Sequence, residues 1–169
     1  MNHAGEIAPL TRMVAPEVAI ITTVEPVHLG QFPSEEAIAD AKSEILLGLV
    51  RGGVAILNHD NRHTERIRSR ADAFGIRVVT FGAAPDAGIR ATDLRPDPEG
   101  TDVTATISGR TISYRVGQPG THVAMNSLAV AAALSALGLD VAEALAPLAA
   151  LSAPTGRGAR QRFPFKSGE

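Results

Sequence analysis

Lys42 carries a charged amine at a position where the sequence pattern predicts an apolar side chain. Residues 34–49 read as an amphipathic helix when successive side chains are placed about 100° apart. An ammonium group on the apolar face of such a helix must find a partner, shift its pKa or be chemically modified. Its neutral form is also a nucleophile. The predicted apolar face consists of Ile38, Ala41, Lys42, Ile45, Leu46 and Leu49.

His28 is the second residue whose position suggests chemistry. It follows the run 18–24, whose continuous apolar and β-branched composition is typical of a central strand in a parallel sheet. Open α/β sheets bind ligands at the carboxyl ends of their strands. A histidine at a strand end, close to a core-facing lysine, therefore predicts a site for a metal and a phosphate.

The composition narrows the class of protein to which the chain can belong. Its 169 residues suit one domain, and the formal net charge of −2 gives no reason to expect binding to nucleic acid or to an anionic membrane. The absence of cysteine excludes disulfides and thiolate metal sites. The chain has neither an apolar run long enough to span a bilayer nor a signal peptide, so we expect a cytoplasmic protein without membrane insertion.

The order of the elements predicts an α/β fold. Strands over 18–24, 54–57 and 77–81 alternate with helices over 34–49 and 62–74, which is the pattern of right-handed βαβ units. The pattern then changes to an alternating hairpin with strands over 103–107 and 112–116, a neighbouring strand over 89–94, and helices over 120–137 and from 140 onward. We therefore predict a three-layer domain with a mainly parallel sheet, flanking helices and a small antiparallel extension.

Six short segments together suggest a family. In order along the chain they are Asn2-His3-Ala4-Gly5-Glu6-Ile7, His28-Leu29 with Phe32 and Ser34, Ala41-Lys42-Ser43-Glu44-Ile45, Leu57-Asn58-His59-Asp60, Gly120-Thr121-His122 with Met125-Asn126, and Gly156-Arg157-Gly158. Each segment alone is weak, but the ordered set resembles the central, ATP-binding domain of the Mur ligases. It is most similar to the branch that adds D-alanyl-D-alanine to UDP-N-acetylmuramoyl-tripeptide. The resemblance assigns residues 1–153 to this domain and residues 154–169 to a linker and the start of the ligase domain that follows.

The resemblance also implies a reaction and a set of roles. The family uses ATP to phosphorylate a carboxylate, and an incoming amine then displaces the phosphate with the help of Mg²⁺. It implies that Lys42, as a carbamate, and His28 are catalytic residues and metal ligands. It makes Asn126 a contact of the adenine, Arg157 a contact of the nucleotide, and Asn58 a weaker candidate on the nucleotide side. The implied partners are the UDP-N-acetylmuramoyl-tripeptide and D-alanyl-D-alanine, and the implied enzyme is a cytoplasmic monomer.

Three departures from the family pattern limit this interpretation. The chain contains no G-x-x-x-x-G-K-[ST] phosphate loop, and it lacks the metal-binding glutamate that the family carries shortly before the segment 2–7. Gly30-Gln31 also stand where family members usually have Glu-Gly. We therefore expect a piece of a larger enzyme that has neither a complete ATP site nor ligase activity by itself.

Less specific readings exist for each candidate residue. Lys42 could extend its ammonium to water along an apolar surface, and His28 could be a loop residue that satisfies backbone groups. Asn126 could be an ordinary first-turn helix residue, Asn58 a turn residue and Arg157 part of a basic linker. The whole chain could belong to a related ligase, such as another Mur ligase or a folylpolyglutamate synthase, or be a non-catalytic module that binds a nucleotide or a protein.

We expect the remaining charged residues to be solvated. His59 and His63 have no spacing that predicts a metal cluster, so we interpret both as surface residues. The arginines between 62 and 70 are expected to form a solvated helix face rather than a nucleic-acid patch. Glu44 is expected to be a surface charge.

Overall fold

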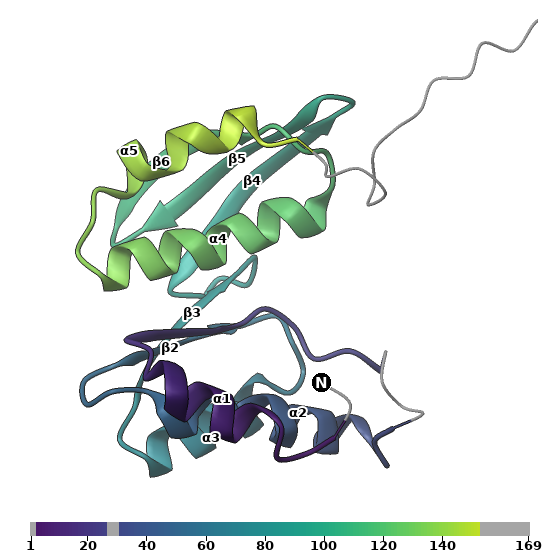
Figure 1. Cartoon of the computed structure of the whole chain (residues 1–169). Helices are drawn as coiled ribbons and strands as arrows, with labels where there is room; N and C mark the ends of the chain where they lie inside the picture. Colours follow the sequence, from purple (N-terminus) through teal and green to yellow (C-terminus); the bar gives the residue numbers. More distant parts are fainter. Residues whose placement is uncertain (1–2, 27–30, 153–169) are drawn as a thin grey trace, which may run out of the picture.

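The computed structural model of the protein describes residues 3–26 and 31–152 (Figure 1). A single six-stranded sheet has the spatial order β1-β2-β3-β4-β5-β6, which is also the order along the chain. The domain boundary predicted after residue 153 lies outside the described residues. The strands are β1 (Val18–Ile21), β2 (Val54–Asn58), β3 (Arg77–Gly82), β4 (Ile89–Asp97), β5 (Gly100–Ile107) and β6 (Arg110–Val116).

Five α-helices and two short 3₁₀ helices surround this sheet in the described part of the chain. None of these helices is both long and apolar enough to cross a membrane. They are α1 (Ile7–Val14), α2 (Glu35–Ser43), η2 (Glu44–Gly48), α3 (Thr64–Ala73), α4 (Thr121–Ala136), α5 (Val141–Leu145) and η3 (Ala146–Ala150).

The sheet changes from parallel to antiparallel along its width. Strands β1, β2 and β3 pair in parallel, and β3 makes a short parallel pairing with β4. Strands β4, β5 and β6 then form an antiparallel meander, with a bulge between Ala91 and Asp93. The predicted fold class, a mainly parallel sheet with flanking helices and an antiparallel extension, is confirmed.

Alternating side chains of the strands feed two separate cores. Val54 and Ile56 of β2 face the core beneath α4, whereas Ala55 and Leu57 face the core beneath α2 and α3. This period of two is the expected consequence of strand geometry. Because both faces are covered by helices, all the residues from Val54 to Leu57 are buried, as the continuous apolar run predicted.

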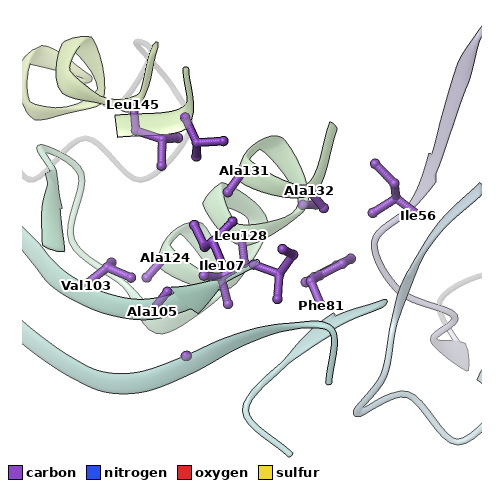
Figure 2. Close-up of a cluster of buried hydrophobic side chains, with 14 of the residues drawn as sticks. Ile56, Phe81, Val103, Ala105, Ile107, Ala124, Leu128, Ala131, Ala132 and Leu145 are labelled. Carbon is purple, nitrogen blue, oxygen red and sulfur yellow. The ribbon is translucent and has the colours of Figure 1, made fainter. Parts of the chain in front are cut away.

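Small residues allow α4 to lie close to the sheet. Figure 2 shows Ala124, Leu128, Ala131 and Ala132 of α4 among side chains from the strands and Leu145 of α5. The alanine-rich sequence thus gives α4 a flat apolar face that packs closely against the strands. A polar bridge reinforces the contact, since the Tyr114 hydroxyl on β6 lies 2.7 Å from the hydroxyl oxygen of Ser127 on α4.

The helix predicted over 34–49 changes character after Ser43. The chain continues as the 3₁₀ helix η2. Helix α1 packs against this segment, and one carbonyl group of η2 accepts a hydrogen bond from an α1 side chain instead of from its own helix. The Thr11 hydroxyl donates a hydrogen bond of 2.8 Å to the Ile45 carbonyl, and the Leu49 amide instead bonds to the Leu46 carbonyl. Gly48 permits this packing, since a Cβ atom there would lie 2.2 Å from the Thr11 carbonyl carbon.

Glu44 fastens the start of α1 and is not the free surface charge that we expected. Its carboxylate accepts hydrogen bonds from the backbone amides of Gly5, Ile7 and Ala8, at 2.6, 3.2 and 3.2 Å. The Ile7 and Ala8 amides belong to the first turn of α1, which has no intrahelical acceptors for them, and Gly5 directly precedes the N-cap residue Glu6. A carboxylate at the positive end of a helix is favourable, so Glu44 supplies a cap from a distant part of the chain.

Ion pairs join α2 to α3 on the side away from the sheet. The Arg66 guanidinium donates two hydrogen bonds to the Asp40 carboxylate, at 2.8 and 2.7 Å, and Arg70 approaches the same carboxylate at 3.3 Å. The hydrogen bond from Arg66 holds the pKa of the Asp40 carboxyl below its ordinary value, and the charge of Arg70 acts in the same direction. This arrangement fixes α2, the helix that carries Lys42.

Replacing Gly48 by alanine should destabilise the domain. The added Cβ would meet the backbone of Thr11 rather than a flexible side chain, so α1 must move. We expect Gly48→Ala to lower the free energy of unfolding by about 1–3 kcal/mol in urea titrations. Asp72→Ala, at an exposed position on α3, is the control and should change it by less than about 0.5 kcal/mol. Equal stability of the two variants would contradict the packing role.

Removing the Asp40 charge should change how stability depends on pH. The lowered pKa of Asp40 means that its pairing stabilises the fold above the ordinary aspartate pKa, and that this contribution is lost as the pH falls through the folded-state value. Asp40→Asn should therefore cost about 0.5–1 kcal/mol at pH 7 and flatten the loss of stability below about pH 4.

Glu65→Gln provides the matched control for this comparison. Glu65 pairs with Arg68 within α3, and its side chain is 75% exposed. Urea titrations from pH 7 to pH 3 should leave this variant close to the wild type. An unaltered pH profile of Asp40→Asn would show that the α2–α3 pairing contributes nothing to acid stability.

Candidate active site

Three consecutive carbonyl groups of the loop after β1 each accept a hydrogen bond from a side chain. The Thr22 carbonyl accepts from the Asn58 amide at 2.9 Å, and the Thr23 carbonyl accepts from the Lys42 ammonium at 2.6 Å. The Val24 carbonyl accepts from the Asn61 amide at 3.0 Å. The donors come from α2, from the last residue of β2 and from the loop that follows β2, so they converge at the carboxyl edge of the parallel sheet, where ligands bind in α/β folds.

Lys42 lies half-buried at this edge. Removal from water lowers the pKa of its ammonium group below the ordinary lysine value, and the nearby Glu25 carboxylate acts in the opposite direction. The geometry therefore gives Lys42 a partner in the Thr23 carbonyl and at the same time favours its neutral, nucleophilic form more than water would.

Asn58 uses both ends of its amide within the protein. Its NH₂ group donates to the Thr22 carbonyl, and its oxygen accepts from the Asp60 amide at 3.0 Å. These are the contacts of a turn residue at the end of a strand. The structure thus brings Asn58 to the same loop as Lys42, while its contact with a nucleotide stays a prediction.

Asn61 belongs to this network although the sequence analysis did not select it. Its NH₂ group donates to the Val24 carbonyl and, at 3.3 Å, to the Thr23 hydroxyl oxygen. Its own oxygen accepts from the His63 amide at 3.0 Å. The available signal was the repetition of asparagine three residues after Asn58, directly behind a buried strand.

The other predicted site residues are placed as follows. His28 and Arg157 lie outside the described residues. Asn126 is exposed on α4, which covers the opposite face of the sheet from α2, so no contact in the described part of the chain joins it to Lys42. Its predicted contact with adenine stays a prediction.

The prediction that His63 is solvated is wrong. His63 is only 7% exposed, and its Nε2 atom lies 3.1 Å from the Glu35 carboxylate, which also pairs with Arg62. His59 is mostly covered as well, and its Nε2 atom lies 3.0 Å from the Asp86 carboxylate. Both histidines are held by carboxylates from neighbouring segments, which spacing along one helix or loop could not reveal.

The donors around Lys42 suit a hard cation only if the lysine changes its charge. Within residues 3–26 and 31–152, no group of three histidine, aspartate or glutamate side chains is arranged to hold a metal. An ammonium group repels Mg²⁺, whereas a carbamate on Nζ would present carboxylate-like oxygens and keep one N–H group for the Thr23 carbonyl. The Glu25 carboxylate and the Thr23 hydroxyl, which are joined by a hydrogen bond of 2.9 Å, add oxygen atoms of the type that Mg²⁺ prefers. A carbamylated Lys42 would supply the carboxylate-like oxygens that this donor set needs for Mg²⁺.

The family model and the relatives that match this chain name the same family. The model of the Mur ligase middle domain matches residues 1–134. A UDP-N-acetylmuramate–L-alanine ligase from Streptomyces coelicolor is 35% identical over 142 residues, which are 84% of this chain and 30% of that protein. A UDP-N-acetylmuramoyl-tripeptide–D-alanyl-D-alanine ligase from Escherichia coli is 33% identical over 159 residues, which are 92% of this chain and 34% of that protein.

The solved structures agree with this assignment. A crystal structure of MurF from Acinetobacter baumannii superimposes with a TM-score of 0.85 at 28% identity, over 99% of this chain and 35% of that one. The chain spans about a third of the length of the curated relatives that it matches. Because the family model covers most of its 169 residues, the chain belongs to the Mur ligase family and carries the middle domain of that family.

Proposed function

We propose that this chain provides part of the ATP domain of a ligase that adds D-alanyl-D-alanine to UDP-N-acetylmuramoyl-tripeptide during cytoplasmic synthesis of peptidoglycan precursors. The observation that carries the proposal is the superposition on MurF of Acinetobacter baumannii over nearly the whole chain. The relative from Escherichia coli whose name states this reaction supports it, with 33% identity over 92% of the chain.

The L-alanine-adding ligases are the nearest alternative. The relative from Streptomyces coelicolor is slightly more identical, at 35%, but over a smaller share of this chain. The segments 2–7 and 41–45 favour the D-alanyl-D-alanine branch, because their order of residues resembles that branch most. We therefore prefer the dipeptide as the incoming amine.

We propose that Lys42 acts as a carbamate and that His28 is the second protein ligand of Mg²⁺. Bound MgATP supplies the phosphoryl group for an acyl phosphate, and Mg²⁺ offsets the negative charge of that transfer. The protein's own part is to keep the Lys42 Nζ atom at the carboxyl edge of the sheet and to lower its pKa by burial. Asn126 would contact the adenine, Arg157 the nucleotide, and Asn58 the nucleotide side of the site.

Carbamylation of Lys42 can be measured on this chain directly. The sequence contains two lysines, Lys42 and Lys166, and the α-amine is a further group that forms a carbamate, so the Lys42 resonance in carbon NMR with ¹³C-bicarbonate is the one that a substitution at position 42 alone removes. We expect a carbamate resonance at about pH 8, because the lowered pKa leaves more neutral amine on Lys42 than on an ordinary lysine. The resonance should be lost in Lys42→Arg, since guanidinium remains protonated.

Lys166→Arg is the matched control for this measurement. It removes the other lysine while keeping its charge, so the resonance of the carbamate should persist. A spectrum in which Lys42→Arg keeps the resonance, or in which the wild type shows none, would refute carbamylation of Lys42.

A competition assay tests the substrate. The ligase in which this domain operates is offered UDP-N-acetylmuramoyl-tripeptide and UDP-N-acetylmuramate, with D-alanyl-D-alanine and L-alanine as competing amines. We expect the dipeptide product to predominate and Lys42→Ala to abolish its formation, with partial recovery when short carboxylic acids replace the carbamate. Preferential addition of L-alanine would overturn the assignment of the substrate, and near-normal activity of Lys42→Ala would overturn the role of the lysine.

A binding module is the second candidate function, and one observation favours it. The 169 residues contain no phosphate loop of the G-x-x-x-x-G-K-[ST] type. Calorimetric titration with MgATP separates the two candidates. Tight binding without hydrolysis would favour a nucleotide-binding module, whereas absence of binding by this chain is the result expected for part of a ligase.

A further inference from the structure

Asn61 is placed to control the peptide that faces Lys42. Its amide group spans two acceptors in adjacent residues, the Val24 carbonyl at 3.0 Å and the Thr23 hydroxyl oxygen at 3.3 Å. Between these two contacts lies the Thr23 carbonyl, which accepts the 2.6 Å hydrogen bond from Lys42. A single amide therefore restrains the peptide on both sides of the lysine's acceptor.

The same contact extends to the nearest carboxylate. The Thr23 hydroxyl accepts from Asn61 and donates to the Glu25 carboxylate at 2.9 Å. Glu25 is the charged group that acts on Lys42 from this loop, while the Asp40 carboxylate of α2 is engaged by Arg66 and Arg70 of α3. By holding the Thr23 hydroxyl, Asn61 fixes the direction in which that hydroxyl presents its hydrogen to Glu25.

Asn61 is itself held rigidly. Its side-chain oxygen accepts from the His63 amide, and its backbone amide donates to the Asn58 carbonyl at 3.2 Å. His63, in turn, is buried against Glu35 of α2. The loop after β2 therefore connects to α2 at one end and to the loop after β1 at the other, with Asn61 between them.

From this geometry we propose that Asn61 is a positioning residue for Lys42, which rests on the role of Lys42 in the proposed function. Asn61 does not touch a reacting group. It fixes the Thr23 carbonyl and the Thr23–Glu25 hydrogen bond, so that the half-buried Lys42 amine is held at the sheet edge as a donor to the Thr23 carbonyl. When the two hydrogen bonds from Asn61 are lost, the loop 22–25 bonds to water in their place, and Lys42 becomes more mobile and more accessible.

The test measures how strongly folding protects Lys42 from an amine reagent. The folded chain is treated briefly with acetic anhydride at one pH, and acetylation of Lys42 relative to Lys166 is read from peptide masses. The same ratio in denaturant gives the intrinsic reactivities. We expect the hydrogen bond to the Thr23 carbonyl to give the half-buried Lys42 a measurable protection in the wild type, and this protection to fall roughly fivefold in Asn61→Ala and in Asn61→Asp, which corresponds to the loss of one hydrogen bond.

Asn61→Asp separates the donors from the shape of the side chain. The carboxylate has nearly the same size as the amide, but it cannot donate to the Val24 carbonyl. Tyr114→Phe is the control for a general loss of stability, because it removes a polar bridge between β6 and α4, far from this loop in the fold. It should leave the protection of Lys42 unchanged.

The outcomes decide the proposal in either direction. Wild-type protection of Lys42 in folded Asn61→Ala and Asn61→Asp overturns it, as does an equal loss in Tyr114→Phe. If neither Asn61 variant folds, Asn61 is a determinant of the whole fold and the positioning role is also rejected. Because acetylation needs no carbamate, a missing carbamate resonance would remove the proposed role of Lys42 and still leave the contact between Asn61 and the loop measurable.

Discussion

The loop after β1 depends on side chains for hydrogen bonds that a sheet would otherwise supply. Beyond Ile21 the strand pairing with β2 ends, and the carbonyls of Thr22, Thr23 and Val24 turn to Asn58, Lys42 and Asn61. Val24 is buried and Thr23 is partly covered, and a buried carbonyl without a partner costs roughly 1–3 kcal/mol, so these two positions select Asn61 and Lys42 as donors. The Thr22 carbonyl accepts from Asn58 at an exposed position. This requirement couples β1, α2 and the loop after β2 into one unit.

The position of Lys42 is set by contacts on three sides of its helix. The apolar residues of α2 pack on the sheet, Asp40 binds the arginines of α3, and the following segment η2 packs against α1 through Gly48. Glu44 adds a cap for α1 from the same segment. The lysine therefore sits on an element that cannot rotate without breaking contacts on several sides, which is the support that a site residue needs.

Much of the fold was predictable because strand and helix periods are local properties of the sequence. The runs at β1, β2 and β3 and the alternation in β5 and β6 predicted the sheet, and the unusual place of Lys42 led directly to the sheet edge. The roles of Glu44, Asn61 and His63 were not predictable in this way. Each of these side chains is defined by a partner that lies at least 28 residues away in the chain. Such tertiary contacts leave no periodic pattern in the sequence.

The choice of lysine at position 42 is informative in its own right. The chain has 16 lysines and arginines, of which only Lys42 and Lys166 are lysines. In the described structure, the basic side chains that pair with the α2 carboxylates Glu35 and Asp40 are arginine or histidine. Arginine suits such pairs because its fork of donors matches a carboxylate and stays charged, whereas lysine can lose its proton when it is removed from water. A position that needed only a cation for the Thr23 carbonyl could have held arginine, so a lysine at position 42 agrees with the carbamate that we propose there.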